Sequence, residues 1–476
     1  MRAPWLHGFV AASSLALSAC ASAPRDVGLS EVQSAVVASS GQQLVWDPQA
    51  PIDAPSSDAA IQPLLAEPIT ANRAVEIAFR NNRDLLATLE NLGIARADLL
   101  QARTIRNPFF EAEIRFPEKP KAPFEVVLMQ PLFDLLRLRA RRAAGEAAFE
   151  VTRLRITGAV LAFASEVRND FYTEQAARQV LARQTAITET ARTAAELAQR
   201  QHEAGNISDL DLESEQARYE TAKLALARAS LDELQARERL IADLGLVDPK
   251  TQLDVPPELP PIPSEDPPVT DLDRALAGRL DLTLARAELA TARASLPLAK
   301  APLFENVAAG AHHEREPEGT RTTGPALELP IPIFDTGRAR RDRALAMIRQ
   351  AEQRLYALDL AGRSAARAAA ERLREARARA EYLRDVVVPR RQRIVALLQL
   401  ENNAMLRGVF DLIRARQDYD QAARDQVLAQ RDYWVARTEL QAALGGVRGF
   451  SVRPETNNSR PLPLFQARDQ QTKENE

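Results

Sequence analysis

Cysteine and aromatic residues are scarce in this sequence of 476 residues, and each shortage excludes a class of structure. The single cysteine, Cys20, rules out an intramolecular disulfide and any metal site built from cysteines. Aromatic residues make up only 5% of the chain, which favours long helices over an aromatic-rich globular core. The formal net charge of −3 shows no basic excess, so we expect no nucleic-acid partner.

Enzyme signatures and long apolar runs are also missing. The chain has four histidines, and it contains no glycine-rich phosphate loop and no nucleophile elbow. We therefore expect a protein that is not an enzyme and that needs no cofactor or metal. After the N-terminal segment no run of about 18 apolar residues occurs, so we expect no transmembrane helix in the mature chain. Such a chain is either periplasmic or crosses a membrane by β-strands.

The N-terminus has the layout of a bacterial export signal. Arg2 precedes an apolar run at 9–17, and small residues lead to Cys20, a segment too short to span a bilayer permanently. The sequence LSAC at 17–20 resembles a lipobox, which predicts a signal peptide at 1–19 and lipid attachment at Cys20. A plain secretory signal that contains a cysteine is the alternative. Residues 20–66, rich in Ser, Ala, Pro and Asp, are then expected to form a lipidated tether.

The second half of the sequence repeats the first. Three blocks of the first half recur in the same order, at offsets of 201, 197 and 200 residues, which predicts a tandem duplication. The matching blocks are PLFDLLRLRARR (131–142) with PIFDTGRARRDR (332–343), ARADLLQAR (95–103) with ARASLPLAK (292–300), and ARERLIADLG (236–245) with ARTELQAALG (436–445).

Each repeat has the same predicted order: one helix, two short extended segments and a long helical hairpin. If residues 135–203 form one helix, it is about 100 Å long at 1.5 Å per residue, so it must be a rod. Gly205-Asn206 is the expected turn of the first hairpin, and Pro389 should kink the second. The predicted boundaries are repeat 1 at 67–248 with strands in 107–131, a proline-rich linker at 249–270, repeat 2 at 271–446 with strands in 304–334, and a tail at 447–476.

The first extended segment alternates between apolar and charged residues. Over about ten residues, one apolar and one charged face suit a strand of a transmembrane barrel, with lipid outside and water inside. A soluble ribbon that packs its apolar face on a helix is the alternative. Four strands cannot close a barrel wide enough to conduct, so a barrel requires several chains. The predicted lipid face comprises Phe110, Ala112, Ile114 and Phe116, and the predicted lumen face comprises Glu111, Glu113 and Arg115.

The duplicated unit carries FD…R after each second strand and DL after each hairpin turn (Asp211-Leu212 and Asp411-Leu412). This pattern resembles the TolC-like outer-membrane efflux factors, and the lipobox suits their lipoprotein branch. The resemblance implies a mainly α fold with a small β part. Long antiparallel helical hairpins of a homotrimer form an α-barrel tunnel, and four strands from each chain form a shared twelve-stranded β-barrel.

The resemblance also implies a function. The chain would be a passive outer-membrane channel subunit of a tripartite efflux system, lipid-anchored in the outer membrane and extending into the periplasm. Its expected partners are a periplasmic adaptor, an inner-membrane pump and outer-membrane lipid. The alternative is a lipid-anchored periplasmic coiled-coil adaptor or scaffold without a pore.

The family's periplasmic gate lies beside the hairpin turns. By the resemblance its aspartates fall on Asp211 and Asp411 and its arginine on Arg407, whereas Arg414 stands where some members have a second aspartate. Asn402 replaces a tyrosine that often packs near the turn, so the gate pattern is only partly matched. Helix capping is the other interpretation of Asp211, because Ser208 precedes acidic residues at an expected helix start.

The repeated FD phrase predicts the junction where a strand becomes a tunnel helix. A proline ends the extended segment, a phenylalanine packs as a staple, and an aspartate caps the first helical turn. His312 and His313 cannot bind one ion together, because adjacent strand residues face opposite sides; a single lumen-facing histidine in a metal exporter stays possible. The predicted junction residues are Pro131, Phe133, Asp134, Pro332, Phe334 and Asp335.

Overall fold

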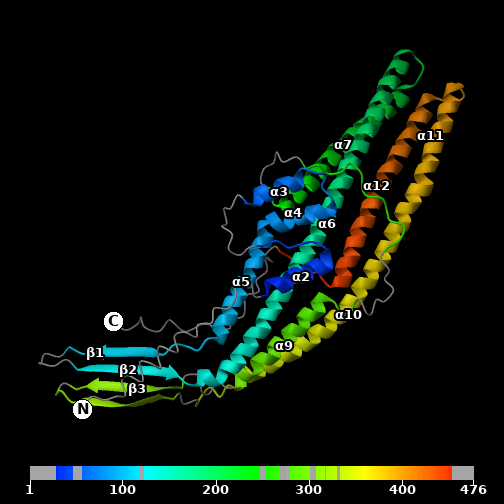
Figure 1. Ribbon diagram of the computed structural model, residues 1–476. Coiled ribbons are helices and arrows are strands. Elements are labelled where there is room, and N and C mark those ends of the chain that lie inside the picture. The colour runs from blue at the N-terminus through cyan, green and yellow to red at the C-terminus, as the bar shows by residue number, and fades with distance from the viewer. Residues whose placement is uncertain are drawn as a thin grey trace.

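The structure is a computed structural model, and it is a long rod of helices with a small sheet at one end (Figure 1). The fold is mainly helical, with long helices and a four-stranded antiparallel sheet, as the sequence predicts. Cys20, the predicted signal peptide and Pro332 lie outside the described residues. The structure describes residues 28–46, 56–116, 123–246, 253–266, 276, 278–300, 307–316, 318–329 and 333–452.

The order of elements in the first half of the chain recurs in the second. In both halves a helix leads into two strands, and a long helical hairpin follows. The first half contains α2 (Leu29–Ser40), α3 (Ser56–Leu65), α4 (Ala71–Asn81), α5 (Arg83–Arg103), β1 (Phe109–Ile114), β2 (Phe124–Pro131), α6 (Phe133–Glu203) and α7 (Asp209–Leu244). The second contains α9 (Leu280–Lys300), β3 (Ala308–Arg315), β4 (Arg321–Glu328), α10 (Arg338–Tyr382), the π-helical turn η3 (Leu383–Val387), α11 (Val388–Asn403) and α12 (Val409–Gly445).

Helix α6 is the spine of the molecule. Its 71 residues correspond to a length of about 105 Å, and it packs against α5, α7, α9 and α12. At mid-length an apolar stripe of Val160, Phe163, Val167 and Phe171 is buried, which forms the main core with α2 and α4. Within the described residues, no helix is both long enough and apolar enough to cross a membrane.

Small residues hold the hairpin of α6 and α7 together. The buried positions of α7 include Ala222, Ala229 and Ala236, which recur every seven residues and face α6. The Thr188 hydroxyl of α6 donates a hydrogen bond to the Ala222 carbonyl, at 3.1 Å. Alanine side chains leave little between the backbones, so the two helices approach closely along the rod.

The sheet joins the two halves of the chain at the end of the rod. Its strand order is β1-β2-β3-β4, and each neighbouring pair is antiparallel. The central pairing is long-range, since Val126 of β2 lies opposite His313 of β3. In the described chain β1 and β4 each pair on one side only, so the sheet has two open edges.

The second hairpin is broken where the sequence predicts a kink. Pro389 is the second residue of α11, and the π-helical turn η3 directly precedes it. Proline cannot donate a backbone hydrogen bond, and its ring crowds the carbonyl four residues earlier. The chain accommodates Pro389 through the wider π turn, in which the Val388 N–H reaches the Leu383 carbonyl.

The linker between the halves forms a strap over three helices. We call residues 253–266 the strap. Its prolines have no backbone N–H, so several backbone carbonyls of the strap have no local hydrogen-bond partner, and side chains of the helices donate to these carbonyls instead. Gln175 of α6 donates to the Pro256 and Glu258 carbonyls, at 3.0 and 2.9 Å. Trp434 of α12 donates to the Pro260 carbonyl at 2.9 Å, so the strap ties the first hairpin to the second.

Part of the segment expected as a tether is helical and packed. Val32 and Val36 of α2 are fully buried, one turn apart, against the core around α6. Arg168 of α6 donates to the Ser40 carbonyl at the end of α2, at 3.1 Å. Residues 29–40 are therefore part of the folded body.

Candidate functional site

The tip of the first hairpin is a tight turn with an acidic helix start. Gly205 has a φ of 72°, which glycine adopts without strain, and Ser208 is the N-cap of α7. The Asp211 N–H donates to the Ser208 hydroxyl at 3.2 Å, and the Ser208 N–H donates back to Asp211 Oδ2 at 3.4 Å. This reciprocal pair is a capping box, so the capping interpretation of Asp211 is correct. The Asp211 side chain nevertheless stays exposed at the tip.

The tip of the second hairpin is built differently. Met405 has a φ of 57°, and Gly408, the N-cap of α12, supplies no side-chain cap. Asp411 is exposed, and it makes no ion pair with another described residue. Asp411 is therefore free of the capping role that Asp211 performs.

The predicted gate arginines lie at the second tip as well. Arg407 Nε lies 3.3 Å from Glu401 Oε2, and the Arg407 carbonyl accepts a hydrogen bond from Asn402 at 3.0 Å. Arg414 is exposed on α12. Among the described residues, no contact joins Asp211 to Asp411 or either aspartate to Arg407. The structure thus places the four predicted gate residues on two neighbouring tips without bringing them into contact (Figure 1).

Strand register separates the predicted lipid and lumen residues of β1 onto opposite faces of the sheet. Directly paired residues of an antiparallel sheet share a face. The predicted lipid-facing residues of β1 pair with Leu128, Val126 and Phe124 of β2. On the same face, Leu128 pairs with Ala311 of β3, and Ala311 pairs with Pro325 of β4. Arg315 and Arg321 lie on this same face at its far end. Phe116 and Arg115 lie just beyond the end of β1.

The opposite face carries a row of carboxylates. Glu113, Glu125 and Glu314 are paired across three successive strands, although Val127 and Met129 also lie on this face. Arg115 Nε lies 2.8 Å from Glu113 Oε1 and so partly neutralises the row. The sequence predicts a face of the sheet only for the residues of β1. Counting in steps of two along PFEVVLMQ (123–130) would also have assigned Glu125 to the charged face. The alignment of Glu125 with Glu314 can be known only from the register of the strands.

The two adjacent histidines face opposite sides of the sheet, as predicted. His312 Nε2 lies 3.2 Å from Glu125 Oε1, on the charged face. His313 Nδ1 lies 2.7 Å from Thr323 Oγ1, and its ring packs against Phe124 on the other face. The described residues contain no cluster of three or more side chains arranged to hold a metal ion.

The strand-to-helix junction departs from the prediction at both aspartates. Asp134 does not cap α6; it is buried, with its carboxylate 3.2 Å from Arg106 Nε and 3.7 Å from a nitrogen of Arg141. Arg106 precedes β1 in the chain and Arg141 follows β2. The burial of Asp134 therefore results from tertiary packing and not from a local helix cap. Asp335 accepts the N–H of Gly337, the N-cap residue, at 2.8 Å and is not itself the N-cap of α10.

The phenylalanines of the junction also differ from each other. Phe133, the first residue of α6, is half-buried, next to Pro131 at the end of β2. Phe334 is 98% exposed, so it does not pack as a staple within its own chain. Nine residues separate β4 from α10, whereas one separates β2 from α6, and the longer connection leaves Phe334 away from the helix.

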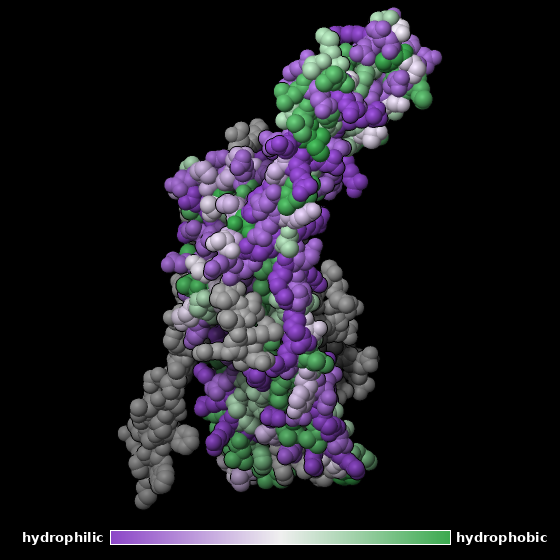
Figure 2. Space-filling model, turned by 90° about the vertical axis from the view of Figure 1, so that its right-hand side faces the viewer, coloured by the Kyte–Doolittle hydropathy of each residue, from purple (hydrophilic) through white to green (hydrophobic). Residues whose placement is uncertain are grey.

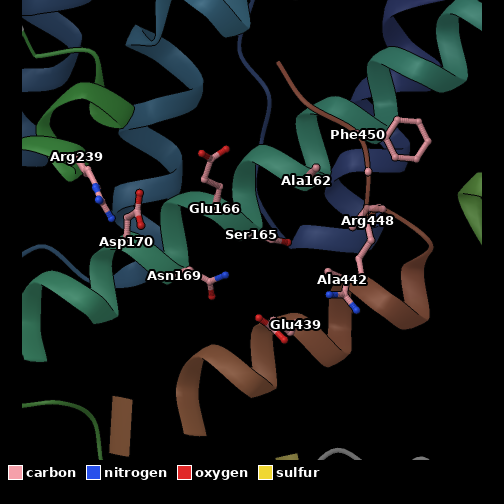
Figure 3. Close-up of a pocket in the computed structure, with 12 residues that line it drawn as sticks. Ala162, Ser165, Glu166, Asn169, Asp170, Arg239, Glu439, Ala442, Arg448 and Phe450 are labelled. Carbon is pink, nitrogen blue, oxygen red and sulfur yellow. The ribbon is translucent and has the colours of Figure 1, made fainter. Parts of the chain in front are cut away.

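A polar pocket of about 560 Å³ lies halfway along the rod (Figure 3). Glu166 and Asp170 of α6, Arg239 of α7, Glu439 of α12 and Arg448 line it. The lining contains neither histidine nor cysteine. Three carboxylates and two guanidinium groups therefore share this hollow.

Comparisons with known proteins agree with this fold. Residues 74–246 match the family described as "Outer membrane efflux protein". The "Cobalt-zinc-cadmium resistance protein CzcC" of Cupriavidus metallidurans is 25% identical over 185 residues, which cover 39% of this chain and 44% of CzcC. The match therefore spans less than half the length of that curated relative.

Solved structures share the fold at low sequence identity. The CmeC outer membrane channel of Campylobacter jejuni has a TM-score of 0.67 and 15% identity, over 80% of this chain and 86% of CmeC. A membrane protein from Pseudomonas aeruginosa has a TM-score of 0.65 and 18% identity, over 79% of this chain and 93% of that one. Residues 74–246 thus match the outer membrane efflux protein family, and the long helices and four-stranded sheet share the fold of TolC-like channel structures.

Proposed function

We propose that this chain is the outer-membrane channel subunit of a tripartite efflux system and acts as a passive trimeric conduit. A four-stranded sheet at the end of a helical rod about 105 Å long supports this proposal most directly. One face of the sheet is mainly apolar and the other is charged, as a strand between lipid and water requires. A scaffold without a pore, the alternative, has no need of such a sheet.

The open edges of the sheet support a shared barrel. Four strands cannot enclose a conducting lumen, but three copies joined from β4 to β1 form a closed barrel of twelve strands. Closure satisfies the backbone groups of both edges, which a lipid environment requires. In this arrangement Phe110, Ala112, Ile114 and Phe116 face lipid, and Glu111, Glu113 and Arg115 face the lumen.

The helical hairpins then form the periplasmic tunnel. Each copy contributes two similar hairpins, which we attribute to a tandem duplication of one wall unit. A rod of about 105 Å extends far beyond the roughly 30 Å hydrocarbon core of a bilayer, so most of it lies in the periplasm. Lipid attached at Cys20 would anchor the N-terminus in the outer membrane.

The hairpin tips serve as the periplasmic gate. Three copies bring six carboxylates, from Asp211 and Asp411, to one aperture, together with Arg407 and Arg414. Like charges at such an aperture repel one another and attract cations, an effect that salt weakens. The same end of the tunnel is where a periplasmic adaptor and an inner-membrane pump would dock.

Divalent metal ions are a candidate cargo. The name of CzcC refers to resistance to cobalt, zinc and cadmium. In this chain His312 stands between Glu125 and Glu314 on the proposed lumen face, and imidazole and carboxylate are weak, reversible contacts for passing cations.

Single-channel recording of the purified protein in a planar bilayer tests the proposed function. The proposal predicts discrete conductance steps from trimers, with a preference for cations that declines as salt rises. No conductance at any salt concentration or voltage would support the pore-free scaffold instead.

A further inference from the structure

Two arginines stand on the face of the sheet that is otherwise mainly apolar. Arg315 is the last residue of β3 and Arg321 is the first residue of β4, and the two are directly paired. In the same register Arg315 pairs with Phe124 of β2, and Phe124 pairs with Ile114 of β1. Directly paired residues share a face, so both arginines lie on the face that the proposed function turns towards lipid.

Closer to the helices this face is apolar. One row across the four strands consists of Phe110, Leu128, Ala311 and Pro325. Leu327 lies on the same face of β4, nearer to the rod, and is 64% exposed. Arg321 is six residues from Leu327, about 20 Å along the strand at about 3.3 Å per residue. The basic pair therefore lies at the far end of an apolar band, and such a band is about 25 Å tall in transmembrane barrels.

No carboxylate compensates the two arginines on their own face. Among the described strand residues, this face contains neither aspartate nor glutamate. Glu314 precedes Arg315 in the chain, but it faces the other side of the sheet, in line with Glu125. Neither arginine makes an ion pair with the turn or with any other described residue. Like charges directly opposite each other destabilise a sheet, so the pair favours a bound anion.

His313 and Thr323 occupy the next row towards the rod. His313 Nδ1 lies 2.7 Å from Thr323 Oγ1, and the centroid of the histidine ring lies 5.6 Å from that of Phe124. When Nδ1 accepts from the threonine hydroxyl, the Nε2–H of the ring is a further hydrogen-bond donor. These polar residues adjoin the arginine pair, and we call the four together the β3–β4 patch: His313, Arg315, Arg321 and Thr323.

The β3–β4 patch lies at the end of the sheet that points away from the helices. Arg315 and Arg321 flank the β3–β4 turn, whereas α9 and α10 join the opposite ends of these strands (Figure 1). The helical rod is mainly hydrophilic at mid-length on the side that Figure 2 shows, as suits a surface in water. In the proposed channel the rod lies in the periplasm, so the patch lies at the level of the outer leaflet.

We infer that the β3–β4 patch binds a phosphate group of lipopolysaccharide, the phosphorylated glycolipid of the outer leaflet. Two guanidinium groups suit a phosphate, because each can donate two parallel hydrogen bonds to its oxygens. The acyl chains of the same molecule lie along the apolar rows of the sheet, which a soluble anion would leave uncovered. The inference rests on the proposed function and specifies which lipid surrounds the outer end of the barrel.

Native mass spectrometry of the purified trimer in detergent tests this contact, with bisphosphorylated lipid A as the probe. The wild-type protein should bind up to three lipid A molecules per trimer. Arg315→Gln with Arg321→Gln should weaken this binding at least about tenfold, because the charge-assisted hydrogen bonds to phosphate are lost. Arg115→Gln removes a positive charge from the opposite face of the same sheet and is the matched control. It should bind lipid A as the wild type does, and equal binding by all three proteins would overturn the inference.

A second measurement uses only the wild-type protein and therefore does not depend on how the variants fold. Lipid A from which a phosphatase has removed both phosphates should bind at least about tenfold more weakly than the bisphosphorylated form. Equal binding of the two lipids would overturn the inference. Phosphatidylglycerol that binds as tightly as lipid A would assign the patch to phospholipid instead. Displacement of lipid A by an equal concentration of inorganic phosphate would reduce the patch to a site for free phosphate.

The outcomes separate this inference from the proposed function. Conducting wild-type trimers whose lipid A binding depends neither on phosphate nor on the two arginines would overturn the inference and leave the proposed function standing. A wild-type protein that forms no trimers and shows no conductance would contradict both.

Discussion

Position 205 at the first hairpin tip is glycine, and the corresponding position 405 at the second tip is methionine. Both residues adopt a left-handed backbone conformation, with φ values of 72° and 57°. This conformation costs a residue with a Cβ atom about 1–2 kcal/mol, whereas glycine adopts it freely. The second tip is therefore strained, and Met405 is 94% exposed there.

Replacing Met405 with glycine should stabilise the second tip. Relief of strain is partly offset by the larger entropy of an unfolded glycine, which leaves a gain of about 0.5–1 kcal/mol. Hydrogen exchange of backbone amides around residues 400–410 should slow by roughly threefold. Met405→Ala retains the Cβ and should show no such protection; equal protection in both variants would disprove the strain argument.

Asp211 and Asp411, the two aspartates of the proposed gate, should respond differently to substitution. Asp211→Ala removes one half of the capping box and should destabilise the first turn of α7 by about 1 kcal/mol, with faster exchange there. Asp411→Asn removes an exposed charge that caps nothing, so local exchange should stay unchanged. If Asp411 belongs to the gate, its variant should still change conductance and weaken cation preference. Unchanged conductance in both variants would remove the aspartates from the gate.

At the scale of elements, contacts with the strap fix the second hairpin just before its π-helical turn. Arg377 of α10 bonds the Asp266 carboxylate of the strap at 2.7 Å, and the Tyr433 hydroxyl of α12 donates to that carboxylate at 2.6 Å. The π turn η3 begins six residues beyond Arg377, on the side of the tip. The strap thus fixes the hairpin just before its irregular turn, and α11 beyond that turn has no buried residue.

The strap should depend on the charge of Asp266. Burial opposes ionisation, but the hydrogen bonds from Arg377 and Tyr433 outweigh it and hold the pKa of Asp266 below its ordinary value of 3.8. A lowered pKa means that the carboxylate stabilises the strap above about pH 4, and that this stabilisation is lost as the pH falls through the lower folded-state value.

Limited proteolysis tests this dependence. Asp266→Asn should speed cleavage after Glu258 or Glu265 by about tenfold at pH 7, since hydrogen bonds to charged groups contribute about 1.5–3 kcal/mol. Wild-type cleavage should stay slow from pH 8 to pH 5, beyond the intrinsic pH dependence of the protease. Asp254→Asn, an exposed strap position, is the control, and equal cleavage of both variants would contradict the role of Asp266.

The two faces of β1 should tolerate charge differently. An aspartate at Ile114 places a charge on the proposed lipid face and should cost roughly 2–4 kcal/mol at mid-membrane, less near the rim. The yield of assembled trimer in outer-membrane fractions should fall accordingly. Glu113→Gln, one residue away on the other face, should assemble normally. Undiminished assembly of Ile114→Asp would show that Ile114 does not face lipid.

At the scale of the whole molecule, local patterns predicted the outline of the fold. The absence of proline between Leu132 and Asp248 and the Gly205 turn located the first hairpin, and alternation located β1. Contacts between distant segments were not predictable in this way. The burial of Asp134 by Arg106 and Arg141, and the alignment of Glu125 with Glu314, depend on tertiary packing and register.

The sequence predicts the proposed gate residues only as positions along the chain. The capping box at Asp211 was readable from Ser208, because it is a local arrangement. Whether Asp211 and Asp411 share an aperture depends on contacts between copies, which one chain does not contain.

The proposed channel requires that β1 form part of the wall of a water-filled pore, with alternate residues facing lumen and lipid. Cysteine accessibility during single-channel recording tests it most directly, in the Cys20→Ser background. Addition of a charged, membrane-impermeant thiol reagent should change the conductance of Glu113→Cys channels stepwise and leave Ile114→Cys channels unaffected. Equal modification of both positions, or of neither in a protein that conducts, would contradict this account.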